Sequence, residues 1–371
     1  MKLTINTQKF LNKVLLSNLT IDSSNINPFL TGIYMKVSDN VISLTSSNLN
    51  NSSFIVMNEG FKVEEGGVLL IKGSTLLNLL SQIKDEEITL TKVENNVLNI
   101  TTSSGSYNLN LFNEESFPAI SFDNQNWLKF ELSTKLIKKI SSSVASCVVP
   151  TSDITNIYNG ISIKTDETEG FIEITGTDGH HLAYLKHPFE GPKFHFIINL
   201  ETLHFIEKIT SESKNAKFHL NNQNLIVEVD NNLYLCKLIE GTFKSLNKWI
   251  NEKYENYLVL NKKEFENIIN ISLILATNNK KPSIELQIKK DKININTINN
   301  ECGSSSQTIK ILDTNIQQNY VITLNVKLLQ HIIKAIPGEE TKFNFINENK
   351  QILINTKDDP ELSYLILPIR L

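Results

Sequence analysis

The residues with the clearest capacity for chemistry lie at 175–184, TGTDGHHLAY. Asp178 and His180 point the same way if this segment is extended, and carboxylate and imidazole are both zinc ligands. The further ligands that a zinc site needs at short spacing are missing. Gly179 indicates a bend or the close approach of another backbone. Two interpretations follow: a metal-dependent hydrolase, or a histidine held by hydrogen bonds at a domain boundary, which the missing ligands favour.

Nucleophilic chemistry has less support, because no serine or cysteine lies in a recognisable activating motif. The three cysteines, Cys147, Cys236 and Cys302, are odd in number and widely spaced. That spacing argues against a disulfide framework and against a CxxC metal site, so we expect buried, reduced thiols. Apart from the zinc interpretation of residues 175–184, these residues give no pattern for catalytic residues, a metal or a cofactor.

The elements that position these residues are clearest in residues 127–147, WLKFELSTKLIKKISSSVASC. Alternation of apolar and charged residues over 128–132 is typical of a strand with one buried face. Ser133 stands where a helix N-cap is expected. The helix that follows has an apolar face and a basic face. The apolar face holds Leu136, Ile137, Ile140 and Val144; the other holds Lys135, Lys138, Lys139 and Ser142.

This strand, cap and helix pattern occurs three times, about 127 residues apart, starting near Leu3, Leu128 and Leu258. A second strand and helix pattern repeats at nearly the same spacing, starting at Val68, Phe194 and Tyr320. Such self-similarity predicts a triplicated α+β fold, with two helices packed on antiparallel sheets in each repeat. We place the domains at 1–124, 125–251 and 252–371, each of ordinary domain size.

The composition is that of a soluble globular protein, with 40% hydrophobic and 20% charged residues. No neutral apolar run is long enough to span a bilayer. Polar residues interrupt the start, MKLTINTQKFLNK, so nothing marks a secretory signal. We therefore expect a cytoplasmic protein.

The net charge of −4 conceals an uneven distribution. We predict helices at 7–18, 74–83, 133–146, 200–209, 262–276 and 325–336. These carry Lys9, Lys13, Lys135, Lys138, Lys139, Lys208, Lys262, Lys263, Lys327 and Lys334. The same helices carry four acidic residues, Glu201, Glu207, Glu264 and Glu266. Their net charge is therefore +6, while the rest of the chain is negative. Helices that share one region of space would make it positive; otherwise the lysines are ordinary solvated helix faces.

The whole chain resembles the bacterial sliding clamp family, the beta subunit of DNA polymerase III. The resemblance rests on the MKLTI start, NGISI at 159–163, TDGHHLA at 177–183 and LPIRL at 367–371, in this order and spacing. It implies the DNA-clamp fold and a homodimeric ring of six similar domains, with sheet outside and helices inside. Double-stranded DNA would run through the ring, held without base readout by the helix lysines. Such a ring confers processivity on the replicative polymerase and has no chemistry of its own.

The resemblance also implies a pocket between the second and third domains for short linear peptides of the polymerase, the clamp loader and repair polymerases. An apolar slot with a few polar rim groups suits an extended peptide. Carried over residue by residue, the pocket comprises Tyr158, Thr177, Gly179, His180, His181, Leu182, Lys248, Trp249, Gln351, Leu365, Leu367, Pro368, Ile369 and Arg370.

Several positions depart from the family pattern. His181 replaces an arginine and Lys244 a proline, which changes the expected peptide preference. The family's DNA contacts outside the helices correspond to Ser24, Ser152, Asn156 and Ile157, so the helix lysines are the better candidates here.

For the dimer interface, the resemblance points to Tyr107 and Leu109 on an edge strand, and to Ile274 and Leu275 on a helix. An apolar edge needs cover from another subunit. A β-rich scaffold without a nucleic-acid partner is a further alternative.

Overall fold

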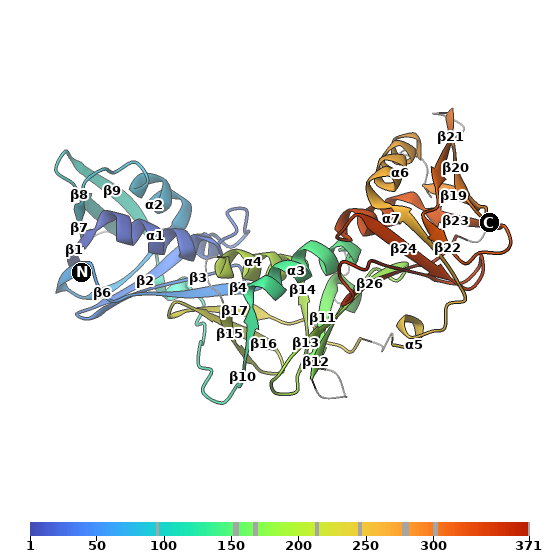
Figure 1. Ribbon diagram of the computed structural model, residues 1–371. Coiled ribbons are helices and arrows are strands. Elements are labelled where there is room, and N and C mark those ends of the chain that lie inside the picture. Colours follow the sequence, from blue (N-terminus) through green and yellow to red (C-terminus); the bar gives the residue numbers. More distant parts are fainter. Residues whose placement is uncertain are drawn as a thin grey trace. The chain divides into compact units, whose positions relative to one another are not determined.

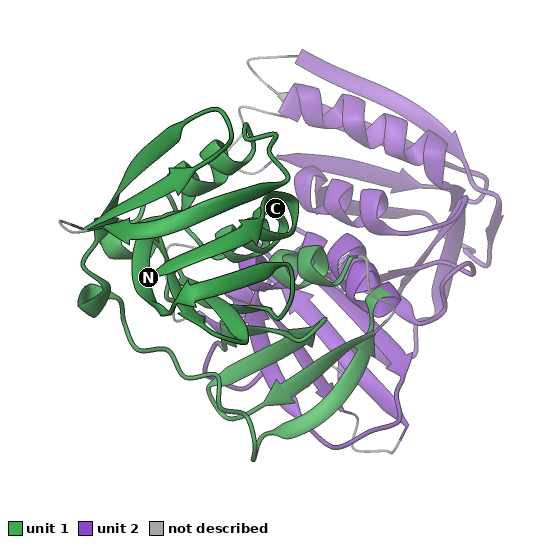
Figure 2. Ribbon diagram, turned by 90° about the vertical axis from the view of Figure 1, so that its left-hand side faces the viewer, with its two compact units in different colours: residues 1–134, 204–238 green, residues 135–203, 239–371 purple. Residues whose placement is uncertain are grey.

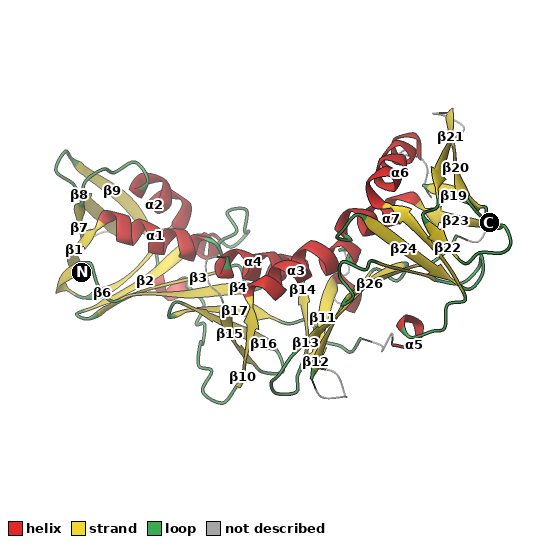
Figure 3. Ribbon diagram, viewed as in Figure 1, coloured by secondary structure: helices red, strands yellow, loops and turns green. Residues whose placement is uncertain are grey.

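The computed structural model describes residues 1–93, 96–150, 156–165, 170–211, 215–243, 247–276, 282–299 and 303–369. Single helices separate runs of antiparallel strands along the chain, so the α+β prediction is confirmed (Figures 1 and 3). No helix in these ranges is long and apolar enough to cross a lipid bilayer.

The chain divides into two compact units, which do not follow the repeat boundaries (Figure 2). Unit 1 comprises residues 1–134 and 204–238, and unit 2 comprises residues 135–203 and 239–371. The middle repeat is thus shared between the units. The boundaries after residues 124 and 251 stay a prediction from the sequence.

Unit 1 is organised by one sheet of thirteen strands, in the order β10-β15-β16-β17-β4-β3-β2-β6-β9-β8-β7-β1-β5. Strands of the first and middle repeats meet where β4 pairs with β17, with Ser52 opposite Leu235. The strands are β1 (Lys2–Asn6), β2 (Gly32–Ser38), β3 (Val41–Ser47), β4 (Asn51–Met57), β5 (Phe61–Glu65), β6 (Gly67–Lys72), β7 (Glu87–Val93), β8 (Val97–Thr101), β9 (Ser106–Phe112), β10 (Leu128–Ser133), β15 (Asn215–Leu220), β16 (Asn224–Val229) and β17 (Asn232–Lys237).

Two helices of unit 1, α1 (Thr7–Asn18) and α2 (Gly73–Leu80), pack beside each other, and α1 also packs on β3 and β4. The Asn6 side chain accepts a hydrogen bond from the Lys9 amide and so caps α1. Phe10 and Val14 form its buried face. A further helix, α4 (Leu200–Thr210), crosses the division between the units; the short 3-10 turns of unit 1 are η1 (Pro28–Thr31) and η2 (Glu114–Ser116).

Unit 2 contains two sheets, with orders β14-β11-β12-β13-β26-β25-β24-β18-β22 and β21-β20-β19-β23. Middle and third repeats meet where β13 pairs with β26, with Leu182 opposite Leu365. The strands are β11 (Gly160–Thr165), β12 (Phe171–Thr177), β13 (His181–Pro188), β14 (His195–Asn199), β18 (Asn256–Asn261), β19 (Ser283–Ile288), β20 (Lys292–Asn299), β21 (Gly303–Lys310), β22 (Asp313–Thr314), β23 (Tyr320–Asn325), β24 (Glu340–Phe345), β25 (Ile352–Asn355) and β26 (Leu362–Ile366).

The remaining helical elements are α3 (Thr134–Ser143), η3 (Val144–Cys147), η4 (Ile157–Asn159), α5 (Asn247–Ile250), α6 (Lys262–Ala276) and α7 (Val326–Ala335). The six predicted helices are confirmed, with α3 tightening into a 3-10 turn at its end. Its predicted apolar residues, from Leu136 to Val144, are buried as expected. Cys147 and Cys236 are buried and unpaired, whereas Cys302 lies outside the described residues.

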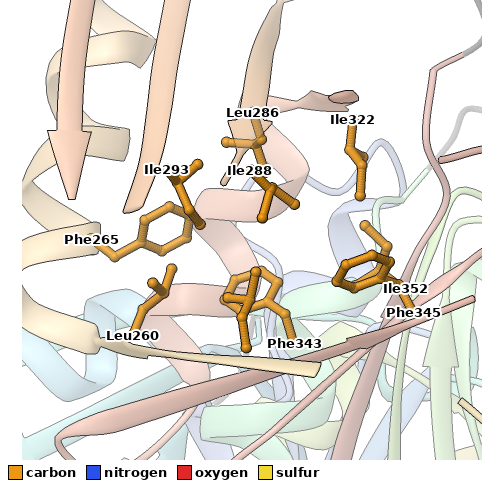
Figure 4. A pocket seen from close by; sticks show the side chains of 10 residues that line it. Leu260, Phe265, Leu286, Ile288, Ile293, Ile322, Phe343, Phe345 and Ile352 are labelled. Atoms are coloured by element: carbon orange, nitrogen blue, oxygen red, sulfur yellow. The ribbon is translucent and has the colours of Figure 1, made fainter. Parts of the chain in front are cut away.

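The core of the third repeat lies between the two sheets of unit 2 (Figure 4). Phe343 and Phe345 of β24 contribute to it from one sheet, and Leu286 and Ile322 contribute from the other. The space left among the ten apolar lining residues is about 10 Å³, no more than one water molecule requires. This region is therefore a packed core and offers no room for a ligand.

Candidate functional site

Residues Thr177–His181 form a hydrogen-bonded corner between β12 and β13. The Thr177 hydroxyl accepts a bond from the Gly179 amide at 3.0 Å and donates to the His181 carbonyl at 2.6 Å. The Asp178 carboxylate accepts bonds from the amides of His180 and His181, both at 2.9 Å. Gly179 has φ +88°, in the left-handed region that glycine tolerates. This string therefore turns the chain, as Asx turns do.

Asp178 also fixes the histidine ring, since its carboxylate lies 2.8 Å from Nδ1 of His181, whose side chain is fully buried. Burial opposes ionisation of Asp178, but hydrogen bonds from His181 outweigh it and lower the pKa of Asp178 to about 2. Asp178 does not share a ligand set with exposed His180, and nowhere in the described ranges do three potential metal-binding side chains gather. His181 is thus held by hydrogen bonds, and its place at a domain boundary stays a prediction from the sequence.

Beside this corner lies an apolar cluster of Leu182, Tyr184, Leu353 and Leu365. Leu365 stands opposite both Leu182 on β13 and Leu353 on β25, so the pairing of three strands brings these side chains together. The segment before β18 covers part of the cluster with Ile250 and Tyr254.

Two large apolar side chains next to this cluster in the sequence are exposed, Trp249 before Ile250 and Leu367 two residues after Leu365, each at 49%. The Tyr254 hydroxyl donates to the Trp249 carbonyl at 2.7 Å, which ties the α5 segment down. The Leu367 amide donates to the His180 carbonyl at 3.1 Å, which holds the C-terminal segment against the corner. Exposed apolar groups over an apolar cluster are the ordinary construction of a docking site.

Polar groups complete the margin. The Gln351 amide nitrogen bonds to the Glu252 carboxylate, which Lys350 also approaches at 3.5 Å. Lys248 is exposed beside Trp249. Farther along, the Ile369 amide donates to the Thr323 carbonyl at 2.8 Å, so Pro368 lies between two anchored residues.

The predicted pocket residues fall into distinct groups. Leu182 and Leu365 lie in the cluster. Thr177, Gly179 and His180 belong to the corner, and Leu367 is bonded to it. Tyr158 lies on η4, with its ring 5.5 Å from that of Phe243. His181 points inward, where its ring centroid lies 5.8 Å from that of His331 on α7. Arg370, Lys244 and Ser152 lie outside the described residues.

The sequence analysis did not predict four residues of the apolar cluster and its cover, namely Tyr184, Leu353, Ile250 and Tyr254. Tyr184 could have been found, because it lies two residues after Leu182 on the same face of β13. The other three come from segments that are adjacent to β13 only through sheet pairing or chain packing.

The ten candidate lysines differ in their surroundings. Those that are exposed, with no ion pair among the described residues, are Lys135, Lys138, Lys208, Lys263, Lys327 and Lys334. Lys9 is exposed but lies 2.7 Å from Glu59. Lys13 is partly buried, and burial lowers its pKa against the pull of Asp230.

Two of the ten are engaged inside unit 2. Lys139 Nζ lies 2.8 Å from the Asp359 carboxylate and 2.7 Å from that of Glu361. Lys262 Nζ donates to the Ile336 carbonyl at 2.6 Å. These two amino groups are therefore less available to a ligand than the six exposed ones.

The candidate dimer residues lie near the surface of their own units. Tyr107 on β9 is 39% exposed, and Leu109 is half-buried. Ile274 on α6 is 71% exposed, with Leu275 half-buried beside it. In the described pairings β9 joins β6 only through Leu111 and Phe112, so its earlier residues have a partner strand on one side alone.

Repeated helices on antiparallel sheets, with an apolar cluster where two repeats meet and exposed helix lysines, are the features of the three-domain clamp fold. Three family models match the chain: the N-terminal domain of the DNA polymerase III beta subunit over residues 1–121, the central domain over 129–245 and the C-terminal domain over 248–370. The chain belongs to this family of beta sliding clamps, non-catalytic processivity factors of DNA polymerase III.

Individual relatives agree along their whole length. The chain is 26% identical over 392 residues to the beta sliding clamp of Mycoplasma genitalium, with 100% of both sequences covered. It is 24% identical over 382 residues to that of Bacillus subtilis, again with 100% of both covered. The crystal structure of the DNA polymerase III beta chain from Streptococcus pneumoniae matches with a TM-score of 0.92 at 20% identity, covering 100% of each chain.

Proposed function

We propose that two copies of this chain close into a ring around double-stranded DNA in the cytoplasm and tether the replicative polymerase to it. The observation that carries this proposal is the exposure of helix lysines in a chain whose net charge is −4. On α3, Lys135 and Lys138 are exposed while Leu136 and Ile140 are buried, so the basic face is turned away from the packed face. Lysines on such faces attract phosphate without reading bases, which permits sliding.

The proposed partner site is the surface around Leu182 and Leu365, with Trp249 and Leu367 exposed at its margin. Short linear peptides of the polymerase, the clamp loader and repair polymerases would bind there in extended form. Subunit pairing would cover Tyr107 and Leu109 of one subunit with Ile274 and Leu275 of the other. An apolar strand edge is a liability unless it is covered.

Retention on circular DNA tests this proposal. Clamp loaded onto a nicked plasmid by a clamp loader should stay bound during gel filtration and be lost when the plasmid is linearised. Enclosure predicts this difference, whereas simple affinity predicts equal retention on both forms. A β-rich scaffold without a nucleic-acid partner would be retained on neither.

Charge reversal localises the contact. The double variant Lys135→Glu, Lys138→Glu should leave circular DNA at lower salt than the wild type, because exposed charges are screened. Lys289→Glu, Lys290→Glu is the matched control, since both lysines are exposed in unit 2 outside any helix. Equal losses from both variants would contradict a DNA-facing role for the α3 lysines.

A further inference from the structure

The corner beside the proposed peptide site has a copy in unit 1, at Ser47–Asn51. The Ser47 hydroxyl accepts a hydrogen bond from the Leu49 amide at 3.0 Å. The Asn48 side-chain oxygen accepts bonds from the amides of Asn50 at 3.0 Å and Asn51 at 2.7 Å. These three bonds repeat those that Thr177 and Asp178 accept in unit 2.

The strands that follow the two corners are also equivalent. In unit 2 the residue after the corner, Leu182, stands opposite Leu365. In unit 1 the residue after the corner, Ser52, stands opposite Leu235. Each junction therefore places a strand of the next repeat beside its corner.

An aromatic residue of the connecting segment packs at each junction as well. Tyr254 packs on the unit 2 cluster, which includes Tyr184, two residues after Leu182. Phe122 lies with its ring 5.5 Å from that of Phe54, two residues after Ser52. The corner, the paired strand and the aromatic side chain beside the proposed peptide site therefore all have counterparts in unit 1.

The copies differ at the turn of the corner. Gly179 has φ +88°, and a side chain added there would meet nothing within 4 Å. The equivalent Leu49 has φ +75° and is 51% exposed. A leucine in the left-handed region is strained, and exposure of its side chain to water adds no compensation. Strain of this kind persists where the surrounding structure holds the backbone in place, as the three hydrogen bonds of this corner do, and it clusters at ligand-binding sites.

Leu49 lines a pocket of about 310 Å³, within the range of small ligand sites. Ile120 and Leu235 supply further apolar wall, and Asn50 and Asn224 supply amide groups. Among the described residues that line it, Lys237 is the one with a charge, so none of them brings a carboxylate to it. The pocket thus combines an apolar wall with an uncompensated positive charge, which complements an acidic peptide.

We propose that this pocket is a second linear-peptide site, for an extended segment that places one aliphatic side chain against Leu49 and Leu235 and a carboxylate beside Lys237. Residues two apart in an extended peptide point the same way, so leucine and aspartate at that spacing satisfy both contacts. The inference rests on the proposed peptide site of unit 2, whose construction it copies.

The test uses the full chain and an acetylated hexapeptide with leucine and aspartate two residues apart. Hydrogen exchange read by mass spectrometry should show protection over residues 47–52 as well as 177–182. Lys237→Glu should weaken binding at 47–52 by about tenfold and leave 177–182 protected, because a repulsive charge replaces an attractive one. Leu49→Gly should do the same without loss of thermal stability, since glycine suits a positive φ.

The matched variant Leu365→Ala should remove protection at 177–182 only. Protection that is confined to 177–182 would overturn the second site and leave the proposed function standing. Protection at 47–52 that neither Lys237→Glu nor Leu49→Gly reduces would also overturn it. Protection at neither corner would refute the second site together with peptide binding at the first.

Discussion

Replacing Lys139 tests whether a lysine of the basic helix face serves the fold. Its amino group lies 2.8 Å from the Asp359 carboxylate and 2.7 Å from that of Glu361, and its side chain is 26% exposed. Burial by itself would lower the pKa of Lys139, but the hydrogen bonds to the two carboxylates outweigh it and raise the pKa. His187 Nδ1 lies 3.0 Å from the same Glu361 oxygen that Lys139 contacts.

Lys139→Met keeps the aliphatic stem and removes the charge, so two carboxylates lose their shared cation. Hydrogen bonds to charged groups contribute about 1.5–3 kcal/mol each, and partial exposure places this pair at the lower end. The hydrogen bond between His187 Nδ1 and the Glu361 carboxylate remains in the variant, which limits the loss. We therefore expect the free energy of unfolding to fall by about 2 kcal/mol.

Urea unfolding followed by circular dichroism and tryptophan fluorescence measures this loss. Lys138→Met is the matched control, because Lys138 is exposed on the same helix without an ion pair in the described part of the chain. It should change the free energy of unfolding by less than about 0.5 kcal/mol. The reasoning is refuted if both variants unfold at the same urea concentration.

Three further predictions concern the docking surface, acid stability and the core. Leu367→Ala should weaken peptide binding by about 1–3 kcal/mol in a calorimetric titration and leave the dimer's size unchanged; full affinity would put the pocket elsewhere. The pKa of Asp178 is lowered from 3.8 to about 2, so its contribution to stability is complete above pH 4 and lost as pH falls through 2. Asp178→Asn should flatten the fall in urea midpoint over that range, and an unchanged slope would show that other groups dominate. Ile322→Ala should cost about 2–5 kcal/mol by urea unfolding, because it empties part of an already packed core; a loss below 1 kcal/mol would show that the core collapses to fill the space.

The helices could be predicted because their signals are local. The spacing of Leu136 and Ile140 marks the buried face of α3, and Ser133 directly precedes its first residue. The string at 175–184 drew attention for chemistry, yet its short-range feature, an Asp that accepts the amide two residues on, is an Asx turn. Such features can be predicted because they depend on contacts between residues that are close in the sequence.

What could not be predicted depends on pairing between distant residues. Nothing near Ser52 in the sequence indicates Leu235 as its partner across the sheet. Lys139 belongs to a basic helix face by periodicity, while its carboxylate partners lie more than two hundred residues later. The burial of His181 against His331 is of the same kind.

The middle repeat has no sheet of its own, and this limits how the chain can be taken apart. Its strand β17 pairs with β4 of the first repeat, and its strand β13 pairs with β26 of the third. A fragment cut at residues 125 and 251 would leave β17 and β13 as unpaired edge strands, which promote aggregation. The three repeats are therefore not interchangeable pieces, since the strand pairs β4–β17 and β13–β26 join each repeat to its neighbour.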